Sequence, residues 1–340
     1  MKAVVYHSIN DIRLDETPEP KIESPNDALI RVSLSSICAS DIHIKALGLQ
    51  QPGKILGHEY CGKIEEVGKE VHYLRKGDRV IGKPFSHCGH CFYCQHQQPE
   101  LCEKVAIFGS QGEQGVQAEY ARIPWAENTL KKIPDGLSDE DILFTGDILS
   151  TGLTPLLRGH LGYGETVAIF GSGPVGLCAV ACAKLFGASQ IIAVDILDYR
   201  LHVARKFGAI TINASKDNPI AKIKELTEGR GADLGIEAAG VESTFNVCLQ
   251  STRRGGRMSI VGMFVKPTYF NIADRFLDIF HLSIGLGDCN HIEELMTLIK
   301  SGNLDLKPLI THRLSLSDAL KGYEIFEKKL ENCIKVVLKP

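Results

Sequence analysis

Four cysteines lie within fifteen residues between Cys88 and Cys102, in the pattern C-x2-C-x2-C-x7-C. Zinc prefers four ligands in a tetrahedron, and a C-x2-C pair supplies two of them from one tight turn. We therefore predict a structural zinc bound by Cys88, Cys91, Cys94 and Cys102. Four protein ligands leave no position for water or substrate, so this metal would hold the local fold. Disulfides are the alternative, and nothing else in the chain points to the oxidising compartment that they require.

The bulk composition is that of an ordinary globular protein. The chain has 340 residues, 44% of them hydrophobic, which suggests two domains with cores of normal size. Its net charge of −3 argues against nucleic acid as the main partner. The apolar run at the start is too short for a signal peptide or a membrane span, so we expect a cytoplasmic protein with no membrane partner. Six further cysteines are interpreted as reduced core residues, namely Cys61, Cys178, Cys182, Cys248, Cys289 and Cys333.

The sequence pattern changes near residue 151. Before it, short alternating apolar runs between glycines and prolines predict an irregular, mainly antiparallel β domain, with strands in 28–37, 62–68 and 78–82. After it, apolar strands alternate with segments of helical period, which predicts a doubly wound parallel α/β sheet. Its six strands are expected at 166–170, 190–195, 209–213, 234–239, 257–262 and 282–286. The predicted domains are 1–150 and 151–286, with the tail 287–340 returning to the first.

A glycine-rich turn follows the first of these strands. GSGPVG, residues 171–176, has the form G-x-G-x-x-G and stands between a strand and a helix, the context that a dinucleotide-binding turn requires. Gly171 would permit the tight turn, Gly173 the approach of a pyrophosphate, and Gly176 the close packing of helix and strand. Pro174 and Val175 complete the turn, and the helix N-terminus offers free N–H groups to phosphates. A tight turn without a ligand is the alternative.

The second strand of this half ends in a carboxylate. Asp195 stands 19 residues after Gly176, where it can accept from both hydroxyls of an adenosine ribose and would repel a 2′-phosphate. This predicts NAD in preference to NADP. Arg200 could soften that preference or could pack beside the adenine.

Further ligand-type residues stand outside the four-cysteine run. Cys38, His58 and Asp147 could supply sulfur, nitrogen and oxygen to a catalytic zinc, with Glu59 beside them. Such a zinc needs three protein ligands and one exchangeable position. We interpret His7, His72, His202 and His312 as structural or surface residues. His87, His90 and His96 border the cysteine run and are interpreted as its solvated surface.

Taken together, these motifs resemble the zinc-dependent medium-chain dehydrogenases, the alcohol dehydrogenase family, over essentially the whole chain. The order runs from C-x-S-D-x-H (38–43) and GHE (57–59), through the cysteine run and GD-x3-TG (146–152), to GSGPVG. The stretch 115–134 is similar to the formaldehyde-dehydrogenase-like branch. The resemblance implies a GroES-like catalytic domain, a Rossmann domain that binds NAD, and two zinc ions per chain. It also implies a homo-oligomer, a tetramer or alternatively a dimer.

The resemblance assigns roles to individual residues. Cys38, His58 and Asp147 would bind the catalytic zinc, and Glu59 would be a fourth, exchangeable ligand. Type members have cysteine where this chain has Asp147, which makes the ligand set harder. They also differ at Ala39, where some members place an arginine on the pyrophosphate, and we expect Lys335 to take a phosphate-binding role instead.

The expected mechanism oxidises an alcohol. Zinc would polarise the substrate oxygen, and hydride would pass to the nicotinamide. Ser40 would accept the alcohol proton and pass it, through the nicotinamide ribose, to His43. Asp41 would hold the ring of His58, and Thr151 would touch the nicotinamide.

We considered four functions for this sequence. An NAD-dependent alcohol dehydrogenase acting on primary or secondary alcohols is favoured, and a polyol or amino-alcohol dehydrogenase of the same family is the alternative. A zinc-free quinone or enone reductase would lack Cys38, His58 and the cysteine run. A zinc-ribbon module for nucleic acid would need a basic face beside the cysteines, and residues 83–104 do not supply one.

Overall fold

The computed structural model describes residues 1–340 and contains two compact units. Unit 1 comprises Met1–Asp147 and Asp288–Pro340, and unit 2 comprises Ile148–Gly287. No helix in the chain combines the length and the apolar composition needed to cross a bilayer.

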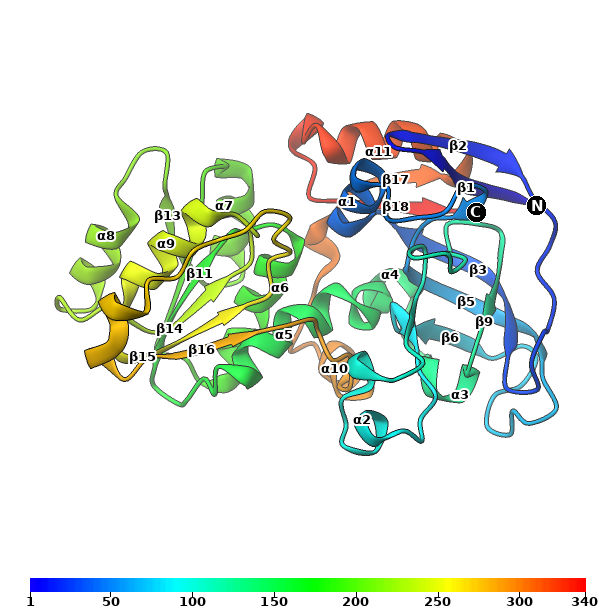
Figure 1. Cartoon of the computed structure of the whole chain (residues 1–340), viewed down its shortest axis with the longest axis horizontal. Helices are drawn as coiled ribbons and strands as arrows, with labels where there is room; N and C mark the ends of the chain where they lie inside the picture. Colours follow the sequence, from blue (N-terminus) through cyan, green and yellow to red (C-terminus); the bar gives the residue numbers. More distant parts are fainter. The chain divides into compact units, whose positions relative to one another are not determined.

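Unit 1 is built around a seven-stranded sheet in which all neighbouring strands but one pair are antiparallel (Figure 1). Its strands, in spatial order, are β10 (Leu130–Lys132), β6 (Arg79–Gly82), β5 (Glu59–Val67), β3 (Ala28–Ser36), β18 (Lys335–Lys339) and β17 (Ile310–Ser315), with β9 (Tyr120–Ile123) also paired to β3. The chain tail supplies β17 and β18, so residues far apart in the sequence meet in one sheet. The mainly antiparallel β domain predicted from the sequence is confirmed.

Smaller elements complete unit 1. A second sheet joins β2 (Asp11–Glu16), β1 (Lys2–Ser8) and β4 (Lys54–Ile55), and a short ladder joins β7 (Phe85–Ser86) to β8 (Ala106–Ile107). The helices are α1 (Ala39–Leu47), α2 (Phe92–Gln95), α3 (Ala126–Thr129), α4 (Asp139–Ile142), α10 (Ile292–Lys300) and α11 (Ala319–Glu327), with 3-10 turns that include η1 (Pro99–Leu101) and η2 (Leu143–Gly146).

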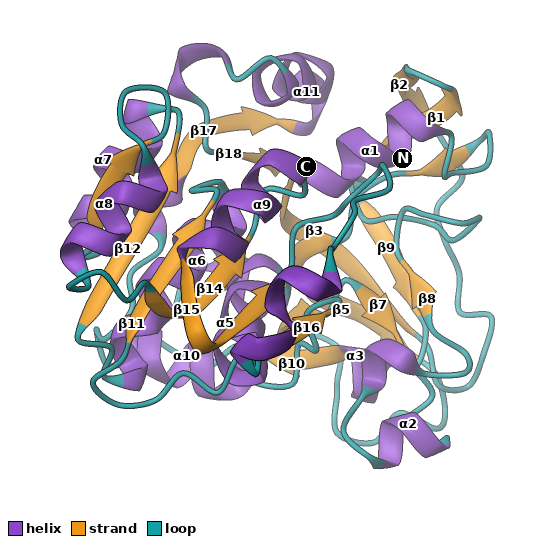
Figure 2. Cartoon of the chain, turned by 60° about the vertical axis from the view of Figure 1, so that its left-hand side comes forward, coloured by secondary structure: helices purple, strands orange, loops and turns teal.

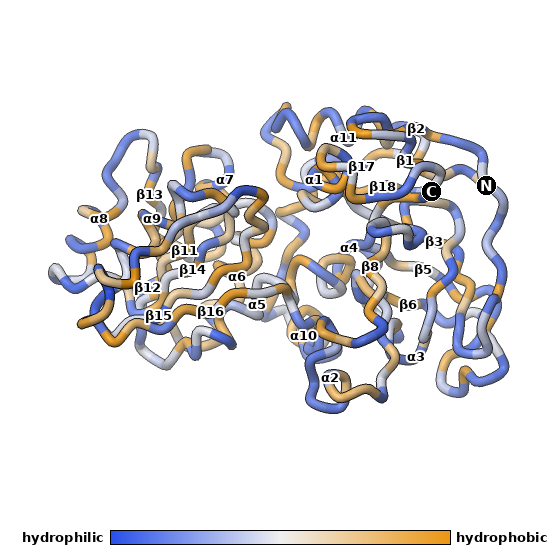
Figure 3. Tube along the Cα trace, in the orientation of Figure 1, coloured by the Kyte–Doolittle hydropathy of each residue, from blue (hydrophilic) through white to orange (hydrophobic).

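Unit 2 is a six-stranded, fully parallel sheet in the order β13-β12-β11-β14-β15-β16. This is the order of dinucleotide-binding sheets, and the predicted Rossmann fold is confirmed. The strands are β11 (Thr166–Phe170), β12 (Gln190–Asp195), β13 (Ile210–Asn213), β14 (Ala232–Glu237), β15 (Thr252–Ile260) and β16 (His281–Ile284). Their apolar runs are buried because helices cover them, and Figure 3 shows β11 and β12 largely in the hydrophobic colour.

The helices of unit 2 flank this sheet (Figure 2). They are α5 (Ile148–Arg158), α6 (Pro174–Ala183), α7 (Asp198–Lys206), α8 (Pro219–Leu226) and α9 (Glu242–Ser251). Helix α5 was not expected, because Gly152 and Pro155 disfavour a helix. It forms because its apolar face packs on α6, so tertiary burial outweighs local propensity.

Candidate metal centres and cofactor site

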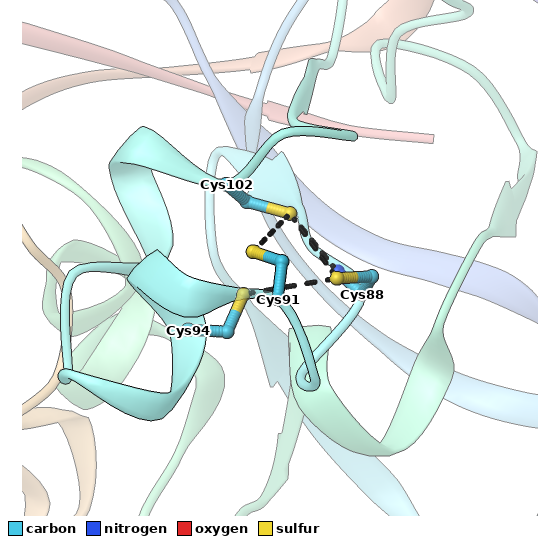
Figure 4. A group of neighbouring side chains, drawn as sticks. All are labelled: Cys88, Cys91, Cys94 and Cys102. Carbon is cyan, nitrogen blue, oxygen red and sulfur yellow. Dashed lines mark hydrogen bonds between the residues drawn. The ribbon is translucent and has the colours of Figure 1, made fainter.

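The four cysteines of the 88–102 segment converge on one point (Figure 4). They come from the loop after β7, from α2 and from the end of η1. The Sγ–Sγ distances are 3.5 Å for Cys88–Cys102, 3.8 Å for Cys91–Cys102 and 4.0 Å for Cys88–Cys94. A zinc–sulfur bond of about 2.3 Å gives a tetrahedral edge of about 3.8 Å, so the four thiols fit zinc. All eleven cysteines of the chain are free thiols, and no disulfide competes.

Hydrogen-bond donors surround this thiol cluster. The N–H groups of Cys88 and Lys104 donate to Cys102 Sγ, each at 3.3 Å. His90 and His96 are exposed, as expected. The same expectation for His87 is wrong: its side chain is buried, with Nδ1 3.5 Å from Cys94 Sγ. The ring turns inward because Asn128 holds His87 from both sides, through its backbone oxygen and its side-chain amide.

The second ligand set also comes together. One atom each from Cys38, His58, Glu59 and Asp147 lies within 4.8 Å of the others. Cys38 Sγ is 3.9 Å from Asp147 Oδ2, and His58 Nε2 is 3.4 Å from the same oxygen. Zinc bonds of about 2.0–2.3 Å give tetrahedral edges of roughly 3.4–3.7 Å, so a zinc fits between these atoms. The cluster mixes sulfur, nitrogen and oxygen, as open catalytic sites do.

Local structure positions each of these ligands. Cys38 stands directly before α1, His58 directly before β5, and Asp147 directly after η2. Asp41, in the first turn of α1, accepts a hydrogen bond from the Cys38 N–H at 2.9 Å. Its other carboxylate oxygen lies 3.2 Å from His58 Nδ1, which confirms the predicted contact. With Nδ1 beside Asp41, Nε2 faces Asp147, and a hydrogen on Nδ1 would leave Nε2 free to bind a metal.

Gln117 and Tyr323 support Asp41 and were missed by the sequence analysis. Gln117 Nε2 donates to Asp41 Oδ2 at 3.2 Å, and Tyr323 OH donates to Gln117 Oε1 at 2.7 Å. All three side chains are buried. Nothing in the local sequence marks them, because they meet only through the packing of α11 on the sheet.

Glu59 is buried against Lys335. The Lys335 Nζ donates to Glu59 Oε1 at 2.6 Å and to the Ile37 oxygen at 2.9 Å, and Ser36 donates to the other Glu59 oxygen. Burial would lower the pKa of Lys335, but the Glu59 carboxylate outweighs it and raises that pKa. The phosphate-binding role expected for Lys335 is therefore corrected: its ammonium is fully buried and neutralises Glu59.

Ser40 and His43 both lie on α1, and Ser40 lies beside His58. Ser40 Oγ is 3.1 Å from His58 Nε2, so its hydroxyl borders the position of the metal. His43 is half-buried, and burial lowers the pKa of its ring. A neutral imidazole there can accept a proton at neutral pH.

The cofactor turn lies in unit 2, between β11 and α6. Gly171 has φ +92°, a conformation that favours glycine. A Cβ on Gly176 would lie 1.8 Å from the Gly171 oxygen, so only glycine fits. Gly173 caps α6, and Pro174 and Val175 form its first turn. The free N–H groups of this turn can hold a pyrophosphate.

Asp195 closes this turn from the end of β12. Its Oδ2 accepts from the Ser172 N–H at 2.7 Å, and its Oδ1 accepts from the N–H groups of Ile196 and Leu197. Arg200 Nη1 lies 3.8 Å from the same carboxylate. Thr151 stands on α5 beside Gly287. A carboxylate at the end of this strand is the arrangement in which a hydrogen bond from an adenosine ribose hydroxyl is accepted and a 2′-phosphate is repelled.

Comparisons with known proteins agree with both sites. Residues 24–135 match the alcohol dehydrogenase GroES-like domain, and residues 174–301 match the zinc-binding dehydrogenase family. The chain is 38% identical to alcohol dehydrogenase TADH from Thermus sp. ATN1, with a TM-score of 0.95 over 100% of this chain and 99% of that one. It is 34% identical over 351 residues to the sorbitol dehydrogenase of Bacillus subtilis (strain 168), covering 100% of this chain and 97% of the relative.

A third relative was solved with its cofactor. A zinc-binding dehydrogenase from Sinorhizobium meliloti 1021, bound to NADP, is 26% identical and has a TM-score of 0.90, covering 100% of this chain and 99% of that one. Family matches, fold, thiol cluster and dinucleotide turn agree along the whole sequence. The chain therefore belongs to the zinc-dependent medium-chain dehydrogenase/reductase family and is an NAD(P)-dependent zinc alcohol dehydrogenase.

Proposed function

We propose that this enzyme transfers hydride between a primary or secondary alcohol and NAD, and that each chain holds two zinc ions. Unit 1 would be the metal-binding domain and unit 2 the NAD-binding domain. The observation that carries the proposal is the mixed cluster of Cys38, His58 and Asp147, whose donor atoms lie at zinc-ligand spacing in unit 1.

Cys38, His58 and Asp147 would hold the catalytic zinc, with Glu59 as an exchangeable ligand. A zinc held by these residues would supply Lewis-acid chemistry, which would make the alcohol more acidic. Asp41 keeps the His58 ring oriented. Lys335 holds Glu59 in its buried position, so Glu59 must leave this ion pair before it can reach a metal.

Ser40 and His43 would carry the proton away from the substrate. Ser40 Oγ borders His58 Nε2, and it would accept the alcohol proton. His43 stands three residues later on α1, on the same side of the helix. The lowered pKa of His43 keeps its ring ready to receive the proton at neutral pH.

The turn at Gly171, Gly173 and Gly176 would bind the cofactor pyrophosphate, with Pro174 and Val175 in the helix that opens there. NAD supplies the hydride acceptor. Asp195 would accept from the adenosine ribose, and Thr151 would lie beside the nicotinamide. Arg200 is already oriented toward Asp195, so its charge serves that carboxylate and gives NADP little support.

A polyol dehydrogenase is the second candidate, because the sorbitol dehydrogenase of Bacillus subtilis is similar over the whole chain. The shared metal and cofactor residues do not separate the two. The assignment to the formaldehyde-dehydrogenase-like branch stays a prediction.

We also propose a cytoplasmic homotetramer, with a dimer as the alternative. Eleven free thiols support a reducing compartment.

For the oligomer, strand β16 lies at the edge of its sheet. Ile284, on this strand, and Leu286, just after it, are 69% and 62% exposed. An exposed apolar edge strand favours pairing with the same strand of a second copy. Replacing both residues with lysine should lower the mass measured by light scattering, whereas Tyr73→Lys, at an exposed hydrophobic residue of unit 1, should not.

Two measurements test the function. Elemental analysis should find two zinc ions per chain. One zinc would remove one of the two metal assignments, and none would remove both. A panel of primary alcohols, secondary alcohols, polyols and amino alcohols, followed by NADH absorbance, should give the highest kcat/KM with a simple alcohol. A higher kcat/KM with sorbitol or another polyol would favour the polyol dehydrogenase over the alcohol dehydrogenase.

A further inference from the structure

His87 connects the four-cysteine cluster to a buried lysine. Its Nδ1 is 3.5 Å from Cys94 Sγ. Its Nε2 is 3.3 Å from Lys83 Nζ and 3.1 Å from the Asn128 oxygen. Only 7% of His87 and 5% of Lys83 is exposed, so these contacts are shielded from water. Neither residue belongs to the metal or cofactor sites described above.

The thiol cluster needs donors of this kind. Four thiolates around Zn²⁺ carry a net charge of about −2, and a buried charge must be offset by hydrogen bonds. Cys102 Sγ receives two backbone N–H groups. His87 is the side chain that reaches Cys94, and it can help this thiolate only if Nδ1 carries the hydrogen.

The neighbours of Nε2 decide where that hydrogen lies. A neutral imidazole has one N–H and one acceptor nitrogen. Lys83 has only donors, so it favours a lone pair on Nε2 and the hydrogen on Nδ1. The Asn128 oxygen favours the opposite tautomer. With zinc bound, the negative sulfur at one end and the ammonium at the other both favour Nδ1–H, and together they outweigh one carbonyl.

We propose that His87 is a positioning residue for the structural zinc: it donates Nδ1–H to the Cys94 thiolate, and Lys83 holds it in that tautomer. The proposal rests on the zinc assigned to the cysteine cluster. Partners of this kind typically change metal affinity by 10- to 100-fold.

Four variants separate the hydrogen bond from packing. His87→Phe keeps a ring but removes the donor. Asparagine branches at Cγ as histidine does, so His87→Asn can place an N–H where Nδ1–H stands. His87→Gln carries the same amide one bond further, at the place of Nε2, and is its matched control. Lys83→Met removes the ammonium and keeps most of the side chain.

The experiment follows the release of zinc to a chromogenic chelator. The kinetic phase that is absent in Cys102→Ser is assigned to the zinc of the cysteine cluster. We expect release about 10- to 100-fold faster in His87→Phe and His87→Gln, within about 3-fold of the parent in His87→Asn, and about 10-fold faster in Lys83→Met. In cobalt-substituted protein, the thiolate charge-transfer band should move to longer wavelength in His87→Phe and His87→Gln but not in His87→Asn.

Two results would overturn the proposal. Parental release from His87→Phe would show that no hydrogen bond is lost, and equal release from His87→Asn and His87→Gln would leave only a packing role. If the parent held no zinc in this cluster, both the two-zinc assignment and the role of His87 would fail. If the parent held this zinc but the variants released it as the parent does, only the role of His87 would fail.

Discussion

At the scale of single residues, the chemistry of each site depends on charges that neighbouring residues hold in place. Asp41 orients His58, and Lys335 compensates the buried charge of Glu59. Asp195 is held by three backbone N–H groups, so its carboxylate cannot turn away from a cofactor phosphate. Buried groups of this kind tolerate little change, because water cannot replace a lost partner.

Asp195→Asn should shift cofactor preference toward NADP. Removing the charge abolishes the repulsion of a 2′-phosphate, and unit charges 4 Å apart at a surface interact by about 4 kcal/mol. At about 1.4 kcal/mol per factor of ten, the ratio of kcat/KM for NADP to that for NAD should therefore rise by up to about 10³-fold. Steady-state kinetics with both cofactors measures it, and Asp217→Asn, at an exposed aspartate of the same unit, is the control. A parent enzyme that uses both cofactors equally would refute the NAD assignment.

His43→Ala should slow alcohol oxidation most at low pH. Burial lowers the pKa of His43 below the ordinary value for histidine, so in the parent its ring stays unprotonated and able to accept a proton at neutral and mildly acidic pH. Without it, a general base worth roughly 10²-fold is missing, and the decline should begin at higher pH. The pH dependence of kcat/KM measures this, and added imidazole should restore part of the rate.

Two further variants serve as controls for the pH dependence of His43→Ala. His58→Ala removes a metal ligand, so its activity should be lost at every pH and imidazole should not restore it. His72→Ala, at an exposed histidine, should behave as the parent. A His43→Ala profile that matches the parent would show that the proton leaves by another route.

At the scale of elements, the segment 88–102 has little structure of its own. Helix α2 has four residues and η1 has three, and isolated helices of that length do not persist in water. Phe92 and Leu101 are 61% and 50% exposed, so the segment has no core of its own. The convergence of four thiols is what holds it together.

Cys102→Ser should therefore destabilise the protein. Loss of one ligand from a structural zinc costs several kcal/mol, and the melting temperature should fall by roughly 10 °C. Thermal unfolding and zinc content measure this. Cys61→Ser is the matched control: Cys61 is also buried and its Sγ contacts the Asp139 oxygen, which a hydroxyl can still contact. Full zinc content in Cys102→Ser would contradict the assignment of the cluster.

At the scale of the whole molecule, the two ligand clusters differ in coordination. The cysteine cluster has four protein ligands at zinc spacing, whereas the other has three ligands and a carboxylate that is already paired to Lys335. An open metal exchanges faster than a closed one, because a chelator can enter its free position. The two metals should therefore leave in sequence.

Mild chelation should remove one zinc quickly and the other slowly. Activity should follow the fast zinc, and the melting temperature should follow the slow one, because the closed site contributes to folding. Metal content, rate and thermal unfolding, recorded on the same samples, test this. Returning zinc after the fast phase should restore activity. Loss of activity only with the slow zinc would reverse the two assignments.

The sequence alone determined those features that are encoded in neighbouring residues. The spacing of Cys88, Cys91, Cys94 and Cys102 specifies a tight cluster, and six strand–helix units specify a parallel sheet. The turn at 171–176 was recognisable from its G-x-G-x-x-G spacing between a strand and a helix, and two of its glycines meet a local steric demand: Gly171 has φ +92°, and a Cβ on Gly176 would lie 1.8 Å from the Gly171 oxygen. Cys38, His58 and Asp147 are far apart in the sequence, so their residue types only suggested a ligand set, and it was the resemblance to the family that implied their shared role.

The tertiary structure decided what depends on long-range packing. Lys335 reaches Glu59 because the tail strand β18 pairs with β3, and Gln117 and Tyr323 reach Asp41 from distant segments. His87 was expected on the surface because it borders the cysteine run, but its ring is buried against Asn128 and Lys83. No pattern of nearby residues encodes these contacts, because burial and hydrogen bonding are set by whichever segments the fold brings together.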